Sequence, residues 1–277
     1  MSDKRIIRID AHTLNTVQSC AREAKFSLKD LLVPMVKAEH LEMGILGHYF
    51  LAGFYQARKD GLKGKARVDK AIEEGRLKSF ELSLEPDKRI EVEKEFFNYC
   101  LHVGEDIWEP MEVEAYFAKP LYEDDELMIL AEGIIDLVGK NIKDDRPEVI
   151  DHKLVWRKSE PFMLSNQFFM YSWATEYQNI VINQFGMQKT LPPNEKFRRL
   201  PYSYTQAMID EWIEWAIYWA KLWVWYQDNG VYPPNYTSCD KFSGCQFRDL
   251  CSTTKDTRDW KASVKFKVGK VWDPRSR

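Results

Sequence analysis

Apolar residues recur at helical spacing through the first part of the chain. The pattern predicts mainly helical structure over residues 12–58, most clearly within 41–57, and another helical stretch within 65–102 that ends near Leu101. The apolar positions of the 41–57 segment that fall at helical spacing are Leu46, Tyr49, Phe50 and Phe54. The spacing therefore predicts a helical N-terminal part.

Shorter segments in the middle of the chain have the character of strands. Apolar and polar residues alternate over 111–119, and apolar runs follow at 129–138 and 148–155. The polar sequence GKNIKDDRP separates the last two runs and suits a hairpin with a somewhat long loop. These segments predict a β-sheet in the central part of the chain.

Helical and extended segments alternate again in the second half. The pattern predicts a helix from about 165 to 177, a strand over 180–186 and a long amphipathic helix from about 205 to 228. Gly230 and the pair Pro233–Pro234 end that helix, and a cysteine-rich coil and a basic tail follow. One stripe of the long helix is aromatic, with Trp212, Trp215, Trp219 and Trp223. We expect this stripe to pack into the core.

The order of these elements predicts an α/β protein with a central mixed β-sheet flanked by helices. No repeat, low-complexity segment or long flexible linker divides the chain. We therefore expect a single domain over 1–277, with a helical part at 1–60 and a helix plus a cysteine-rich segment at 205–255. A composition of 44% hydrophobic and 14% aromatic residues is sufficient for a packed core.

Charge is informative only locally. The formal net charge is −3, so the chain as a whole has no basic excess that would indicate nucleic-acid binding. Basic residues nevertheless gather over 58–78, at Lys196, Arg198 and Arg199, and in the tail 255–277. These patches are either solvated surface or part of a groove for nucleic acid.

The sequence lacks the marks of membrane and secreted proteins. No apolar run reaches the roughly 18 residues of a membrane span, and the N-terminus MSDKRIIRIDAH has no apolar signal-peptide core. We therefore expect a cytoplasmic protein, in which thiols stay reduced. The odd number of five cysteines also argues against a full disulfide framework.

Two aspartates and a lysine lie on the expected central hairpin. Asp136 ends one apolar strand, and Asp151 and Lys153 lie on the next. Residues two apart point to the same face of a strand, and antiparallel pairing can bring Asp136 opposite the other two. Such charges need a partner, and Mg²⁺, which prefers oxygen ligands, is one candidate. The alternative is a salt bridge at a sheet edge.

Other polar residues are candidates for the same site. Gln167 and Tyr171 are four apart on an expected helix and share a face, where they hold a phosphate or the lysine or else make ordinary hydrogen bonds. His48 lies on an apolar helical face and is either a core residue or a nitrogen ligand. His152 alternates away from its two neighbours, so its side chain should pack elsewhere while its backbone carbonyl can face a metal.

Three cysteines near the C-terminus are evenly spaced. Cys239, Cys245 and Cys251 have five residues between successive members. Three thiols so close in a reduced protein indicate a metal or iron–sulfur site, with free buried thiols as the alternative. Such a site needs a fourth ligand, and Cys20 and Cys100 are the candidates. Cys20 would make the site a clasp between the two ends of the chain.

Taken in order, these motifs resemble those of a known family. A histidine on an N-terminal helix (GILGH) is followed by G-x-x-D (GIID), D-x-K (DHK) and Q-x-x-x-Y (QFFMY). The set is similar to the RecB/AddB-type branch of the PD-(D/E)XK nucleases, which includes CRISPR-associated iron–sulfur exonucleases and their phage relatives. Each motif is weak alone, but the ordered set is specific, and it extends from about Cys20 to Cys251.

The resemblance implies a restriction-endonuclease-like fold and a metal-dependent DNA nuclease. The implied ligands of Mg²⁺ or Mn²⁺ are His48, Asp136, Asp151 and the backbone carbonyl of His152. Lys153 would be the catalytic lysine. Gln167 and Tyr171 would complete the catalytic set, and Glu114 would be an outer acidic residue.

The resemblance also implies a 4Fe–4S cluster, with zinc as the alternative. Its ligands would be Cys20, Cys239, Cys245 and Cys251. The family usually has a C-x-x-C pair before the last cysteine, whereas five residues intervene here. Cys100 has no counterpart in the family and is expected to be a core thiol.

The leading functional hypothesis is an exonuclease that hydrolyses phosphodiester bonds at single-stranded DNA ends. One alternative is a non-catalytic DNA-binding subunit, although the intact Asp–Asp–Lys set argues against it. The other is a partner-dependent DNA-processing subunit of a recombination or CRISPR-adaptation complex, working with a helicase or integrase-type protein. The sequence has no G-x-x-x-x-G-K-[ST] motif and therefore no helicase motor of its own.

Overall fold

The computed structural model describes residues 4–36, 38–156, 164–240, 244–271 and 273. These residues form two compact units, each built from separate stretches of chain. The first unit draws on 1–37, 118–133 and 207–277, and the second on 38–117 and 134–206.

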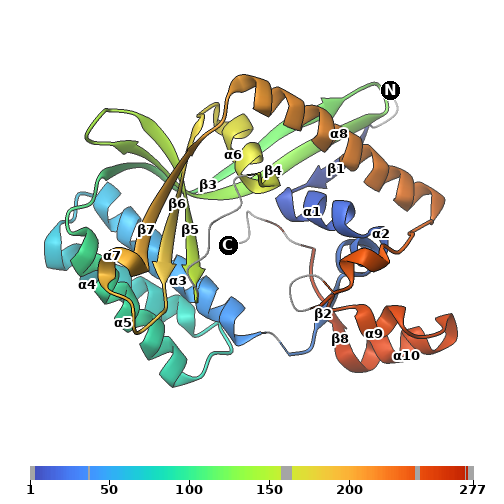
Figure 1. The fold of residues 1–277 in the computed structure, drawn as a ribbon, viewed down its shortest axis with the longest axis horizontal. Coiled ribbons are helices and arrows are strands. Elements are labelled where there is room, and N and C mark those ends of the chain that lie inside the picture. Colours follow the sequence, from blue (N-terminus) through green and yellow to red (C-terminus); the bar gives the residue numbers. More distant parts are fainter. Residues whose placement is uncertain (1–3, 37, 157–163, 241–243, 272, 274–277) are drawn as a thin grey trace. The chain divides into compact units, whose positions relative to one another are not determined.

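The second unit contains helices and a mixed sheet (Figure 1). Its helices are α3 (Glu39–Lys59), α4 (Gly64–Ser79), α5 (Pro86–Val103), α6 (Asn166–Thr175) and α7 (Pro193–Lys196). Its strands are β5 (Pro147–Val155), β6 (Asn179–Gly186) and β7 (Phe197–Ser203), with parts of β3 (Trp108–Glu123) and β4 (Leu127–Asn141). β4 pairs antiparallel with β5, β5 parallel with β6, and β6 antiparallel with β7.

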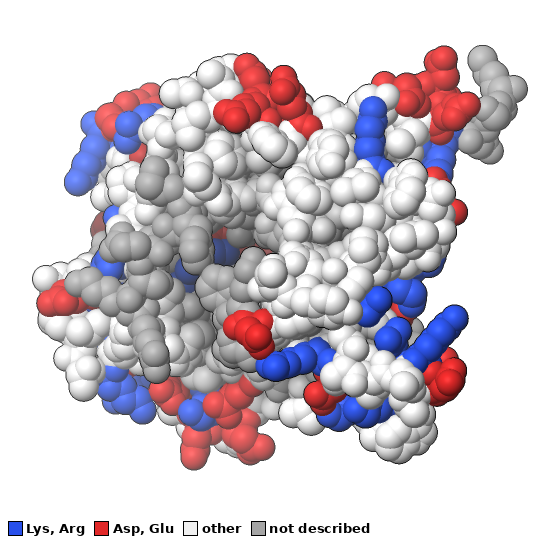
Figure 2. Space-filling model, turned by 45° about the vertical axis from the view of Figure 1, so that its right-hand side comes forward, with Lys and Arg blue, Asp and Glu red and all other residues white. Residues whose placement is uncertain are grey.

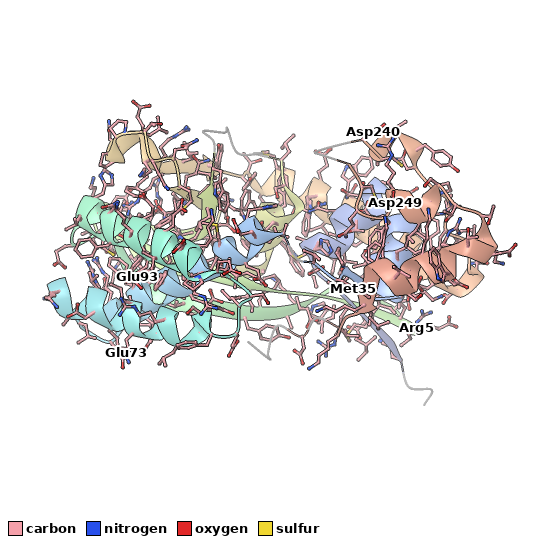
Figure 3. The ribbon with its side chains drawn as sticks, turned by 90° about the horizontal axis from the view of Figure 1, so that it is seen from below. Arg5, Met35, Glu73, Glu93, Asp240 and Asp249 are labelled. Atoms are coloured by element: carbon pink, nitrogen blue, oxygen red, sulfur yellow. The ribbon has the colours of Figure 1, made fainter. Side chains whose placement is uncertain are left out.

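Helices cover both faces of this sheet. On one face, Ile150 of β5 and Val181 of β6 join an apolar cluster together with side chains of α3 and α5. Asp151 alternates to the other face, where α6 reaches it. Figure 3 shows α4 and α5 side by side, and Arg76 of α4 donates to Glu93 of α5 at 2.7 Å. The predicted mixed sheet flanked by helices is therefore present in this unit.

The first unit consists of short elements and one long helix. They are β1 (Arg5–Ile9), α1 (Ala11–Ser19), α2 (Ala21–Ala24), the π-helix η1 (Lys25–Lys29), β2 (Leu32–Pro34), α8 (Gln206–Asn229), the 3₁₀ turn η2 (Tyr236–Ser238), α9 (Arg248–Cys251), α10 (Lys255–Lys265) and β8 (Phe266–Val268). β1 pairs parallel with the start of β4, and β2 pairs antiparallel with β8. Asp10 caps α1 by accepting from the Thr13 amide at 2.7 Å.

The pairing between β4 and β5 is short. The registered pairs run only from Lys140–Pro147 to Leu137–Ile150. One residue further, the Asp136 carboxylate accepts the hydrogen bond of the His152 amide at 2.7 Å. The Asp136 side chain thus accepts the amide hydrogen bond that a backbone carbonyl of β4 would accept if the ladder continued. Asp136 and Asp151 both lie where the β4–β5 ladder ends.

Most predicted elements are confirmed, with several differences. The stretch 65–102 holds two helices, and the hairpin loop between Asn141 and Pro147 is shorter than the GKNIKDDRP break suggested. The strand β7 and the helices α9 and α10 were not predicted. In the aromatic stripe of α8, Trp212 and Trp223 are buried as expected, but Trp215 is 55% exposed. The expectation that the whole stripe packs into the core was wrong for Trp215.

The surface carries mixed charge. Figure 2 shows Lys and Arg side chains interspersed with Asp and Glu, without a single basic field on the face drawn. One of the expected basic patches is largely internal, because buried Lys196 pairs with Glu95 at 2.8 Å and Arg199 pairs with Asp106 at 2.6 Å. Across the described ranges, no helix combines the length and apolar character needed to cross a membrane.

Candidate functional site

Four elements of the second unit bring the predicted site residues together. β4 supplies Asp136, β5 supplies Asp151 and Lys153, α3 supplies His48, and α6 carries Gln167 with Tyr171. Asp136 and Asp151 immediately follow the last registered β4–β5 pair, so they face each other across diverging strands. The predicted antiparallel hairpin therefore does place the two carboxylates at one point.

Asp151 is the centre of a hydrogen-bonded group. It is 1% exposed, and its Oδ1 accepts from Lys153 Nζ at 3.2 Å and from Gln167 Nε2 at 2.9 Å. Lys153 Nζ also donates to Gln167 Oε1 at 3.2 Å. Gln167 therefore bridges the carboxylate and the ammonium, which was one of the two roles considered for it from the sequence.

Tyr171 anchors this group to β4. Its hydroxyl donates to the Ile134 carbonyl at 2.7 Å and accepts from Gln167 Nε2 at 2.9 Å. The shared helical face predicted for the two α6 residues is confirmed. Burial raises the pKa of Tyr171 well above its ordinary value, and the charge of Asp151 adds to the shift, so the phenol stays protonated as a donor.

His48 and Asp136 form the other half of the site. His48 Nδ1 lies 3.4 Å from Asp136 Oδ1. Burial opposes the charged form of each group, but their mutual attraction and hydrogen bond outweigh it, raising the pKa of His48 and holding that of Asp136 well below its usual range. Asp136 is therefore an anion in this arrangement.

The two aspartates have opposite electrostatic environments. Burial raises the pKa of Asp151 to about 6, although the Lys153 ammonium lowers it. The charges of Asp151 and Asp136 in turn raise the pKa of Lys153 against the effect of its own burial. The arrangement places one firmly ionised carboxylate, one carboxylate that is costly to ionise, and one ammonium in contact.

The donor set suits a hard divalent cation. Asp151 Oδ2 is buried and accepts no hydrogen bond, although Lys153 Nζ is 3.0 Å away. Carboxylate oxygens are preferred ligands of Mg²⁺, so a buried carboxylate oxygen without a hydrogen bond can serve as such a ligand. In the part of the chain described, no three His, Cys, Asp or Glu side chains already lie in a metal-binding arrangement. His48 and Lys153 pair with the carboxylates instead.

The side chain of His152 points away from the two aspartates, as predicted. Its ring stacks on Tyr55, with centroids 5.3 Å apart and an interplanar angle of 8°, and its Nδ1 lies 3.0 Å from Asn183 Nδ2. Behind it, Tyr55 and Tyr99 share a 2.8 Å hydrogen bond, and Tyr55 donates to Asp106 at 2.7 Å. This buried polar network fixes the strand that carries the site.

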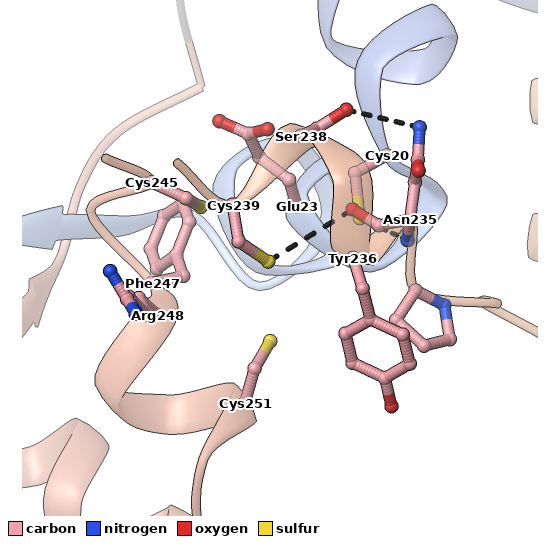
Figure 4. Close-up of a pocket in the computed structure, with 11 residues that line it drawn as sticks. Cys20, Glu23, Asn235, Tyr236, Ser238, Cys239, Cys245, Phe247, Arg248 and Cys251 are labelled. Atoms are coloured by element: carbon pink, nitrogen blue, oxygen red, sulfur yellow. Dashed lines mark hydrogen bonds between the residues drawn. The ribbon is translucent and has the colours of Figure 1, made fainter. Parts of the chain in front are cut away.

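The four cysteines of the expected cluster line one pocket in the first unit. Cys20 comes from the junction of α1 and α2, and Cys239, Cys245 and Cys251 come from the segment after α8. Figure 4 shows the thiols of Cys239 and Cys251 directed into the same space. The structure therefore brings together the residues that the spacing and the resemblance selected.

Asn235 holds the two sides of this pocket together. Its amide N–H donates to Cys20 Sγ at 3.2 Å, and its side chain donates to the Ser19 carbonyl at 2.8 Å. The Cys239 thiol lies 4.0 Å from the Asn235 carbonyl. Burial raises the pKa of Cys245 to about 11 and also raises that of Cys251, and in each case the charge of Cys20 adds to the shift. The thiols are close enough to repel one another as anions, so a cation among them would relieve that repulsion.

Two other predicted residues are also placed. Cys100 lies in the apolar cluster between the sheet and α3 and α5, and burial raises its pKa to about 12, which confirms the expectation of a core thiol. Glu114 has a φ of 51°, and its negative charge contributes to the raised pKa of Tyr171. Glu114, which the resemblance implied as an outer acidic residue, is thus close enough to Tyr171 to influence it electrostatically.

Two asparagines, one beside His152 and one at the cysteine pocket, were not predicted from the sequence. Asn183 is buried on β6 and Asn235 spans the cysteine pocket. A signal for Asn183 was present, because Asn183 and Gln184 interrupt the apolar run IVINQFG. Polar residues inside such a run indicate buried hydrogen bonding.

No family model matches the chain, and no curated protein is significantly similar to it. A solved structure described as the crystal structure of SSO0001 is 13% identical, with 63% of this chain and 86% of that chain covered and a TM-score of 0.31.

Proposed function

We propose that this protein is a metal-dependent DNA nuclease of the PD-(D/E)XK superfamily, with a restriction-endonuclease-like fold. The observation that supports this most is the hydrogen-bonded group of Asp151, Lys153 and Gln167 beside Asp136. These residues also follow one another in the order of the family motifs. The substrate class is a phosphodiester, and the proposed activity is exonucleolytic cleavage of single-stranded DNA ends.

Each residue has a role in this proposal. His48, Asp136, Asp151 and the carbonyl of His152 would hold Mg²⁺ or Mn²⁺, and the buried, unbonded Asp151 Oδ2 supports that donor set. A bound divalent ion would polarise a phosphoryl oxygen and lower the pKa of a water.

The protein's own residues would do the remaining work. Lys153 lies where its ammonium can stabilise negative charge on the phosphate. Gln167 restrains the Lys153 ammonium through a 3.2 Å hydrogen bond. Tyr171 restrains Gln167 in turn. Positioning of this kind keeps the lysine from moving into solvent during the reaction.

We further propose that the cysteine pocket holds a 4Fe–4S cluster, with zinc as the second candidate. Support comes from four thiols that line one pocket and from the N–H···S hydrogen bond of Asn235 to Cys20. Brown anaerobically purified protein with broad visible absorbance and bound iron would agree with the cluster. Colourless protein with stoichiometric zinc would contradict it.

The test of the nuclease is direct. Anaerobically purified protein would be incubated with end-labelled and internally labelled single-stranded DNA, with Mg²⁺, Mn²⁺ or EDTA. Lys153→Ala and Asp151→Ala should each lower the rate by at least about a hundredfold, because each removes charge from the reacting centre. Lys143→Ala, in the loop between β4 and β5, is a matched control that should cleave as wild type does.

Two outcomes would contradict a free-standing nuclease. One is that no DNA is cleaved with either metal. The other is that wild type, Lys153→Ala and Asp151→Ala all cleave DNA at the same low rate. A non-catalytic or partner-dependent subunit would then be the better assignment. Cleavage that occurs only when a co-purified helicase or integrase-type protein is added would identify the partner-dependent subunit.

A further inference from the structure

An exposed aromatic pair lies near the candidate active site. Trp156 directly follows β5, three residues beyond Lys153, and it is 37% exposed. His40 is an exposed residue in the first turn of α3. Their rings meet in a T-shaped arrangement, with centroids 6.1 Å apart and an interplanar angle of 78°. The helix and the strand that carry site residues therefore also carry this pair.

The packing of α3 on β5 fixes where the pair lies. Leu154 packs against Gly47, where an added Cβ would come within 2.2 Å of Leu154 Cδ1. Trp156 lies two residues beyond Leu154, and His40 lies seven residues, or two helical turns, before Gly47. The His40–Trp156 pair thus extends the Gly47–Leu154 contact between α3 and β5 toward the start of α3 and the end of β5. Along α3 it lies about 12 Å from His48.

The distance from Lys153 is also short. Three residues of extended chain span at most about 10 Å. Alternation turns Lys153 and Trp156 toward opposite faces of β5, but His48 of α3 reaches Asp136 from the Trp156 side at 3.4 Å, so the two faces meet at the site. A nucleic-acid strand with a phosphate at Lys153 can therefore pass the end of β5 and place a neighbouring base on Trp156. Bases of a single strand are free to do this, because their faces are uncovered. Bases inside a duplex are stacked on one another and are not free.

Aromatic chemistry favours a base as the occupant. An indole offers a broad apolar face, and stacking of one base on an aromatic side chain contributes about 1–3 kcal/mol. The imidazole of His40 packs against Trp156 and restricts its motion, which lowers the entropy lost when a base binds. Phosphate and sugar have no aromatic face, so they cannot stack on these rings.

We infer that Trp156, supported by His40, is a base-stacking residue that makes the protein bind single-stranded DNA in preference to duplex beside the hydrolytic site. This inference rests on the proposed nuclease function and adds the residue that selects the strand state. Stacking of this kind is tolerant of base sequence, so little preference among the bases is expected.

Binding measured without cleavage tests the inference. Fluorescein-labelled single-stranded oligothymidine and a duplex of equal length would be titrated with protein in EDTA, followed by anisotropy. Trp156→Ala should weaken single-strand binding about tenfold, the lower part of the range for one lost stack, while Trp156→Phe should retain most of it. Duplex binding should not change.

Two controls make the result specific. Trp215→Ala removes a tryptophan of α8 that is 55% exposed, and it should leave binding unchanged. A strand whose central nucleotides lack bases should bind wild type and Trp156→Ala equally. Circular dichroism would confirm that all variants fold.

The inference and the nuclease proposal can fail separately. Equal single-strand affinity of wild type and Trp156→Ala, or equal weakening by Trp215→Ala, would overturn the stacking role even if the protein cleaves DNA. Selective loss of single-strand binding in Trp156→Ala would support it even if no cleavage is found. In an active enzyme, the stacking role predicts a higher KM for single strands with little change in kcat.

Discussion

Burial decides which single residues of the site carry charge. His152 is 2% exposed, and burial lowers its pKa to about 4, so the ring is neutral near pH 7. Its neighbour Lys153 stays charged because two carboxylates stabilise the ammonium. Adjacent residues of one strand thus differ in charge because they point to different faces, one into the polar network behind the sheet and the other toward the aspartates.

The neutral state of His152 predicts a pH dependence of stability. Its pKa is lowered on folding, so its contribution to stability is full above its unfolded pKa of about 6.5 and is lost as the pH falls toward 4. In EDTA, wild type should lose on the order of 3 kcal/mol more of its unfolding free energy than His152→Gln between pH 7 and 4. Urea unfolding at several pH values measures this. Identical pH profiles of the two proteins would show that His152 is not buried in its neutral form.

The helix α3 is positioned by a close approach to β5. At Gly47, a Cβ atom would meet the Leu154 side chain at 2.2 Å, whereas nothing lies within 4 Å of a Cβ at Gly44. The next residue, His48, contacts Asp136. A glycine in a helix interior costs stability by itself, and here it allows the histidine to reach the strand.

Substitutions at the two glycines of α3 should therefore have opposite effects. Gly47→Val should destabilise the protein by about 1–3 kcal/mol through overpacking and should impair metal-dependent cleavage. Gly44→Ala should instead stabilise it by up to about 1 kcal/mol, because alanine favours the helix. Thermal unfolding and cleavage assays measure both. Adding Leu154→Ala to Gly47→Val should restore part of the lost stability, and failure to do so would place the cause outside this contact.

At the scale of the whole molecule, the cysteine pocket links segments far apart in sequence. Asn235 and Cys20, 215 residues apart, share one of its hydrogen bonds. Closing so long a loop costs conformational entropy, and a metal group bound by all four thiols would offset that cost. If the pocket binds the proposed group, the first unit should depend on it more than the second.

Removal of the proposed metal group should loosen the first unit and leave the second unit intact. Chelation, or Cys251→Ser, should increase hydrogen exchange in α1, α9 and α10 while leaving β5 and α6 protected. The pocket thiols should then react with alkylating reagents, whereas Cys100 should react only after unfolding, because it is buried and its pKa is raised to about 12. Cys100→Ser is the control and should keep the full metal content. Equal exchange with and without the group would mean that the pocket does not hold the unit together.

Local patterns predicted much of the fold. The period of apolar residues correctly indicated α3, the β4–β5 hairpin, α6, β6 and α8, because each buries one face whose spacing depends on the element alone. Alternation also predicted that His152 would point away from Asp151. Among the elements that were missed, α10 lies in the stretch that was taken for a basic tail, and β7 carries Arg198, Arg199 and Pro201 within its seven residues.

By itself, the sequence determined most of the longer elements and the order of the candidate residues along them. Only the tertiary structure decided that β4 and β5 part at Asp136, that Gln167 bridges Asp151 and Lys153, and that Cys20 rather than Cys100 joins the other three thiols. It also decided that Lys196 pairs internally and that Trp215 is exposed. The physical reason is that burial and pairing depend on residues remote in the chain, whereas helix and strand periods depend on neighbours.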